Sequence, residues 1–141
     1  MPGNSWKLEA GLNNVGSYQV SGRPFATASI DCKVATRPGG FEIEFPYVTR
    51  WFKVINYDTS NSCRVGFSMS GVTGSSNYFT VPIADADANG AGDSGCLELK
   101  VSSIFVSGST NIDVVAGLTT IAVARTSADS GRNWSGSSGV G

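Results

Sequence analysis

The sequence predicts an all-β protein, an antiparallel β-sandwich with jelly-roll or Greek-key connections and extended arms at both ends. Short runs of β-branched and aromatic residues recur, about eight of them, at intervals of roughly eight to twelve positions with turn residues between them. None of these runs has the period of about 3.6 residues that an amphipathic helix requires. Eighteen of the 141 residues are glycine, and serine and threonine occur throughout, which favours tight turns over helix.

The first predicted strand covers residues 25–35 and ends at a turn over residues 37–40 (RPGG). In the following residues, 41–45 (FEIEF), apolar and acidic side chains alternate, as in a strand with one buried and one solvated face. We therefore expect Glu42 and Glu44 on the wet face of this strand, and not as a catalytic carboxylate pair.

A longer apolar run over residues 47–55 predicts the next strand, and the polar residues 56–62 predict the turn after it. The remaining predicted strands are short runs bounded by turn residues, at 63–69, 78–81, 97–102, 104–106, 112–115 and 118–123. Gly117 is expected to separate the last two of these runs, because glycine weakens a strand interior.

Composition divides the chain into three parts. An N-terminal arm over residues 1–24 has weak periodicity, a sandwich domain follows over 25–124, and a Gly/Ser-rich tail covers 125–141. Large apolar side chains are isolated in the two arms. In the sandwich domain, adjacent residues of a strand face opposite ways, and Trp51 is taken as the outward member of the Trp51–Phe52 pair. The predicted partner-binding residues are Trp6, Trp51, Trp134 and Val140.

The charge and residue content exclude several classes of function. The net charge is −1 and the basic residues are scattered, so we expect no binding to nucleic acid or to an anionic membrane. The chain has no histidine, which removes Ser-His-Asp and Cys-His catalysis and histidine metal sites. No apolar run approaches the roughly 20 residues of a membrane-spanning helix. We expect neither enzymatic activity nor a cofactor.

The three cysteines, Cys32, Cys63 and Cys96, cannot all pair within one chain. None lies in a C-x-x-C spacing, which argues against zinc and redox motifs. The first 22 residues lack the apolar core of a signal peptide, so we expect assembly in a cytoplasm. The cysteines are therefore predicted to be small buried thiols in the reduced state.

An acidic loop over residues 84–95 (ADADANGAGDSG) resembles the first half of an EF-hand calcium loop. Its candidate oxygen ligands are Asp85, Asp87, Asn89 and Asp93. Position twelve of the motif is Cys96, where a bidentate glutamate is required. We therefore predict a solvated loop between strands without a tightly bound metal ion.

Several phrases occur together in this chain: residues 44–52 (EFPYVTRWF), 64–68 (RVGFS), 75–79 (SSNYF), 114–119 (VVAGLT) and 133–141 (NWSGSSGVG). With them, the region from 41 to 141 resembles small β-sandwich virion proteins of tailed phages and large DNA viruses, of the capsid decoration, cement or minor capsid type. The resemblance implies a structural role in a virion, many copies per particle and attachment to a capsid lattice.

The residues and the resemblance together predict a non-enzymatic virion protein that decorates or stabilises a capsid. Its expected partners are capsid proteins and further copies of itself, as a homo-oligomer within the particle. The alternative is a carbohydrate-binding or adhesion module on a virion surface, with Tyr47, Trp51 and Tyr78 as a sugar platform. A small hydrolase is a weaker alternative, because the usual general base is missing.

Overall fold

Eight strands and one short helix make up the part of the chain that the computed structural model describes, which is residues 22–33, 40–85 and 90–123. The elements are β1 (Arg23–Ile30), β2 (Phe41–Glu44), β3 (Tyr47–Asn56), β4 (Cys63–Gly66), α1 (Met69–Thr73), β5 (Phe79–Val81), β6 (Gly92–Asp93), β7 (Ser103–Ser107) and β8 (Ile112–Ala122). This content confirms the predicted all-β class.

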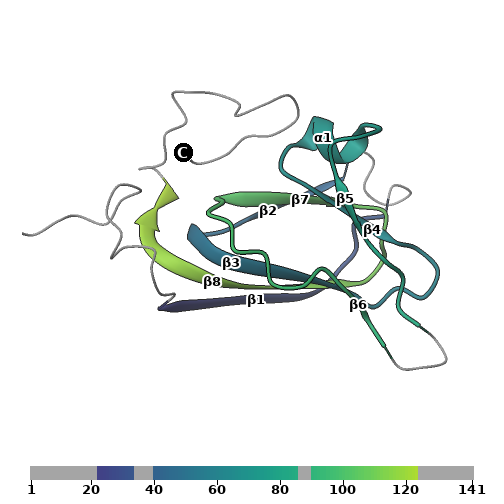
Figure 1. Cartoon of the computed structure of the whole chain (residues 1–141), viewed down its shortest axis with the longest axis horizontal. Coiled ribbons are helices and arrows are strands. Elements are labelled where there is room, and N and C mark those ends of the chain that lie inside the picture. Colours follow the sequence, from purple (N-terminus) through teal and green to yellow (C-terminus); the bar gives the residue numbers. More distant parts are fainter. Residues whose placement is uncertain (1–21, 34–39, 86–89, 124–141) are drawn as a thin grey trace, which may run out of the picture.

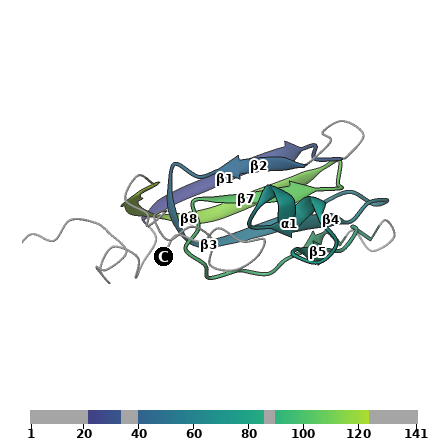
Figure 2. The same cartoon turned by 90° about the horizontal axis from the view of Figure 1, so that it is seen from above.

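The strands form two antiparallel four-stranded sheets that face each other (Figure 1). Sheet A has the order β1-β8-β3-β6, and sheet B has the order β2-β7-β4-β5. Seen from above, β1 and β2 lie along one side of the molecule and β5 lies on the other (Figure 2). Among the described strands, β1 is therefore the edge of sheet A and β2 the edge of sheet B on this side.

The strand pairs are nested along the chain. In the innermost pair β4 joins β5, and further outward β3 joins β6, β2 joins β7 and β1 joins β8. Two additional pairings, β3 with β8 and β4 with β7, complete the sheets. Because β1 pairs with β8, the first and last strands of the described chain lie side by side, with Arg23 opposite Leu118.

The space between the sheets is filled by one apolar core. Its members come from both layers and include Ile43 of β2, Phe52 of β3 and Ile104 of β7. Two edge-to-face ring pairs extend this core, Phe25 with Phe45 at 5.1 Å and Phe52 with Phe67 at 6.3 Å between ring centroids. Such pairs contribute about 0.5–1.5 kcal/mol beyond the area they bury.

Strand β8 is a single strand, although Gly117 was expected to interrupt it. Gly117 lies opposite Pro24 of β1 and Trp51 of β3, so ladder pairing on both sides holds its backbone extended. Glycine has a different role in β6. A Cβ atom on Gly92 would lie 1.9 Å from the carbonyl oxygen of Pro82, so only glycine fits where these two segments pass.

Two other predictions about secondary structure are wrong. The run over residues 63–69 ends as a strand at Gly66, and α1 follows, because the Ser68 hydroxyl caps the helix by accepting a hydrogen bond from Gly71 N at 2.9 Å. The alternating residues 97–102 belong to none of the eight strands, and only Leu97 forms a single bridge, to Phe52.

The first and last described strands lie near the ends of the predicted sandwich domain over residues 25–124. Strand β1 begins at Arg23 and ends at Ile30, earlier at both ends than the predicted strand over 25–35. The end of β8 at Ala122 lies close to the predicted end of the domain. The predicted arm and tail lie outside the described residues, except for the first residues of β1.

Candidate functional site

Among the four predicted partner-binding residues, only Trp51 lies within the described residues; Trp6, Trp134 and Val140 lie outside them. Phe52 is fully buried in the core while Trp51 is half-buried on the opposite face of β3, which confirms that the pair divides between the two faces. Trp51 is therefore placed on the outer face of sheet A, in one row with Gly117 and Pro24.

The aromatic residues proposed for a sugar platform do not share one face. Tyr47 begins β3 in sheet A, whereas Tyr78 directly precedes β5 in sheet B. Both rings already carry a guanidinium group, Arg23 over Tyr47 and Arg64 over Tyr78, each 4.3 Å from the ring centroid. The structure therefore does not assemble Tyr47, Trp51 and Tyr78 into one stacking surface.

Of the candidate calcium ligands, Asp87 and Asn89 lie outside the described residues, and Asp85 and Asp93 have separate positions. Asp85 N donates to Gly90 O at 2.7 Å, which closes the base of the loop. The Asp93 carboxylate forms an ion pair with Lys53 Nζ at 2.7 Å, and this contact lowers the pKa of Asp93. Within the described residues, no group of three or more acidic or cysteine side chains is arranged to hold a metal ion.

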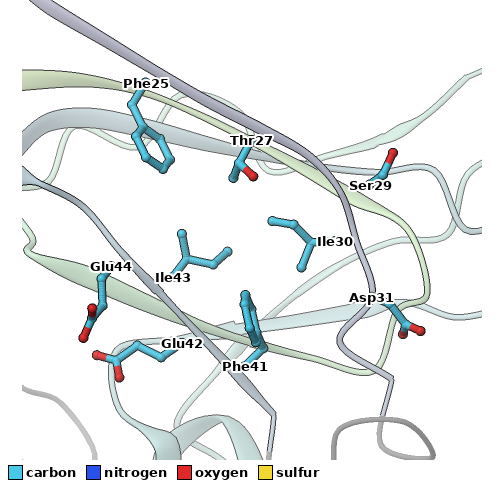
Figure 3. Close-up of a pocket in the computed structure, with 9 residues that line it drawn as sticks. All are labelled: Phe25, Thr27, Ser29, Ile30, Asp31, Phe41, Glu42, Ile43 and Glu44. Carbon is cyan, nitrogen blue, oxygen red and sulfur yellow. The ribbon is translucent and has the colours of Figure 1, made fainter.

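A cavity lies between the edge strands β1 and β2. It has a volume of about 470 Å³, within the range of roughly 300–1,000 Å³ typical of ligand clefts. Figure 3 shows its centre occupied by apolar side chains from both sheets, Phe25 and Ile30 from β1 with Phe41 and Ile43 from β2. We call this the β1/β2 cleft.

Carboxylates border the β1/β2 cleft on the β2 side. Glu42 and Glu44 are exposed, and in Figure 3 they point away from the apolar centre. This agrees with the prediction that the alternation over residues 41–45 separates a buried face from a wet face. Within the described part of the chain, neither glutamate forms an ion pair, so this border carries two uncompensated negative charges.

A buried polar network closes one end of the two-sheet body. Asn56 is fully buried, and its amide nitrogen donates to Asn61 O (2.9 Å) and Pro82 O (3.0 Å). Its oxygen accepts from Asp58 N (3.0 Å) and Ser109 Oγ (2.7 Å). This single side chain therefore joins the β3–β4 loop, the residue after β5 and the β7–β8 turn.

Asp58 continues the network. Its carboxylate accepts five hydrogen bonds, from Ser60 N (2.8 Å), Asn61 N (3.0 Å), Asn61 Nδ2 (2.9 Å), Thr110 N (3.0 Å) and Thr110 Oγ1 (2.7 Å). Burial alone would raise the pKa of Asp58, but these hydrogen bonds outweigh burial and hold the pKa well below its ordinary value. The oxygens of the Asp58 carboxylate are occupied by these five hydrogen bonds, which indicates that Asp58 has a structural role.

Sequence reasoning treated residues 56–62 only as a polar turn and missed this network. The local signal was present, since an aspartate with polar residues two and three positions later favours an Asx turn. The partner Thr110 lies 52 positions away and has no such signal. Within the described residues, all buried side-chain nitrogen and oxygen atoms have a hydrogen-bond partner.

Two of the three cysteines match the prediction of buried thiols, and one does not. Cys32 and Cys63 are fully buried, whereas Cys96 is exposed beside the bridge to Phe52. The hydrogen bond between the Cys32 and Cys63 thiols and their burial raise the pKa of Cys63 and keep it protonated. No disulfide joins them in this structure, and their redox state in the cell stays a prediction.

Comparison with known proteins gives no relative for this chain: no family, no curated protein and no solved structure matches it. In addition, the described residues contain no helix that is long and apolar enough to cross a membrane.

Proposed function

We propose that this chain is a non-enzymatic structural protein of a virion, which decorates or stabilises a capsid by contacts with capsid proteins and with copies of itself. The observation that carries the proposal is the nested strand order. The successive pairs β4·β5, β3·β6, β2·β7 and β1·β8, divided between two sheets, support an eight-stranded jelly roll. Jelly rolls are frequent in viral capsid and lectin domains.

The position of the chain ends supports the same proposal. Arg23 lies opposite Leu118 in the outermost strand pair, so the arm before β1 and the tail after β8 are attached at the same end of the body. Trp6, Trp134 and Val140 are the proposed anchors in these two segments. A rigid β-body with two attachment segments at one end can bind neighbouring subunits without moving its own core.

The polar network favours a scaffold over an active site. Asp58, the most strongly hydrogen-bonded carboxylate among the described residues, is saturated by its own loop and by Thr110. A group in that state stabilises the fold and has no free site for a substrate proton. The carbohydrate-binding alternative has less support, because its three aromatic residues are distributed over two sheets.

The proposal is tested by mass spectrometry of gradient-purified particles from cells that produce the chain. We expect the protein to migrate with the particles in stoichiometric amounts, and a variant lacking residues 125–141 to fold but not to be incorporated. Absence of the full-length protein from the particles would refute the virion role. Incorporation of the shortened protein at wild-type occupancy would refute only the tail as the anchor. A glycan array with the recombinant protein tests the alternative.

A further inference from the structure

We propose that the β1/β2 cleft and the free edge of β2 form a docking site for an extended segment of a partner protein, in which basic and apolar residues alternate. The segment adds as a further strand to sheet B. This proposal goes beyond the virion role and does not depend on it.

Backbone groups of β2 point out of the edge of sheet B. Phe45 N donates to Ser102 O at 2.9 Å, in register with the pairing of Ile43 to Ile104. Residues of an antiparallel pair alternate between facing the partner strand and facing away from it. The N–H and C=O groups of Glu42 and Glu44 therefore point away from β7, at an edge where β2 has no second neighbour among the described strands. These groups form a template for one more strand.

Strand β1, the edge strand across the cleft, is poorly suited to accept an added strand. Phe52 exchanges hydrogen bonds with Leu97, so by alternation the outward-facing positions of β1 are Pro24 and Ala26. Proline has no N–H to donate. Further along, a bulge with Ser29 at a φ of +57° interrupts the ladder, and Ser29 N bonds the Asp113 side chain instead. A partner strand is therefore expected to add to the edge of β2 and not to the edge of β1.

The side chains around the β2 edge determine the chemistry of the segment that would bind there. Residues of an added strand that lie opposite Glu42 and Glu44 share the outer face of sheet B with these two carboxylates. The residues between them face inward, over the apolar centre of the cleft formed by Phe25, Ile30 and Ile43. The matching segment therefore has lysine or arginine at alternate positions and apolar residues between them. A second copy's β2 is excluded, because it would place glutamate opposite glutamate.

The experiment uses the recombinant full-length chain and an acetylated, amidated synthetic peptide of alternating lysine and valine. We expect binding with a dissociation constant below about 1 mM by isothermal titration. We also expect amide hydrogen exchange of Glu42 and Glu44 to slow at least about tenfold on saturation, as new ladder bonds protect these N–H groups. The matched peptide of alternating glutamate and valine should not bind.

Variants separate the charge contribution from the backbone contribution. The double variant Glu42→Lys with Glu44→Lys should bind the lysine peptide about tenfold or more weakly than the wild type does. It should also bind the glutamate peptide. Both positions are exposed, so this variant should melt like the wild type. Glu98→Lys is the control, since it reverses an exposed carboxylate that is paired with Arg50 elsewhere on sheet A. This control variant should bind, or fail to bind, each peptide as the wild type does.

Four results would overturn the proposal. The first is no binding of the lysine peptide at millimolar concentration. The second is equal binding of the lysine and glutamate peptides. The third is undiminished binding of a lysine peptide in which prolines replace the residues that pair with β2, because proline cannot complete the ladder. Protection that appears at β5 instead of at Glu42 and Glu44 would likewise exclude the β2 edge.

Discussion

Replacing Asp58 by alanine tests whether the buried polar network holds the body together. The substitution removes the acceptor of three backbone N–H groups, those of Ser60, Asn61 and Thr110. Bonds to a charged acceptor contribute about 1.5–3 kcal/mol when buried, but these donors are partly exposed and regain water, so about 1 kcal/mol each is the fitting value. We expect Asp58→Ala to lower the free energy of unfolding by about 3 kcal/mol and the Tm by about 10 °C.

Urea unfolding followed by tryptophan fluorescence measures this change. Asp93→Asn is the matched control, since Asp93 also binds a backbone N–H and a lysine but lies on the surface, and it should cost less than about 1 kcal/mol. Thr110→Val removes one of the five bonds and should cost about 1 kcal/mol. A loss below about 1 kcal/mol for Asp58→Ala would refute the conclusion that this carboxylate joins the loops.

The same carboxylate predicts a pH dependence. Its folded-state pKa lies below the ordinary aspartate value of about 3.9, so the folded state prefers the ionised form. The stabilisation is complete above about pH 5 and is lost as the pH falls through the ordinary value toward the folded one. The stability difference between the wild type and Asp58→Ala should therefore shrink between about pH 5 and pH 2. A difference that stays constant over this interval would contradict the assignment.

Further outcomes are expected for the thiols, the acidic loop and the bulge of β1. A thiol reagent should react quickly with Cys96 alone in the native protein and with all three cysteines after unfolding without reductant; a total of one would reveal an internal disulfide. Melting curves with millimolar calcium and with chelator should superimpose, and an upward shift abolished by Asp87→Ala would establish a cation site. Ser29→Val should cost about 1–2 kcal/mol by urea unfolding, because a β-branched residue is strained at a φ of +57°, whereas Ser29→Gly should be tolerated.

The parts of the fold that sequence predicts well are those that local alternation controls. Residues 41–45 and the Trp51–Phe52 pair face the expected ways because one face of each strand packs on the core. Residues 97–102 alternate equally well and lie along β3, where Phe52 exchanges hydrogen bonds with Leu97. Beyond this bridge the Thr49 hydroxyl bonds Leu99 O and Val101 N, so side-chain bonds take the place of a regular ladder. Helix α1 has only five residues and gives no detectable period; its signal was the cap at Ser68.

The candidate sites depend on contacts across the chain and were largely beyond prediction. Glu42 and Glu44 were recognised as a wet face, but the cleft beside them exists only because β7 and β8 bring β2 and β1 to the same side of the molecule. Likewise, the turn around Asp58 was visible, while the turn that supplies Thr110 joins it only through the pairing of the sheets. Distant pairing leaves no trace in local patterns.

Strand β8 is the last of the described strands to leave the ribosome, and it occupies the interior of sheet A, between β1 and β3. The two strands that flank it are synthesised early and do not pair with each other. At synthesis rates of about 5–20 residues per second, β1 waits for several seconds before β8, its ladder partner among the described strands, is made. Vectorial synthesis therefore cannot build sheet A strand by strand. A nascent chain that stops before Ile112 lacks the centre of this sheet, and β1 and β3 remain without the strand that joins them.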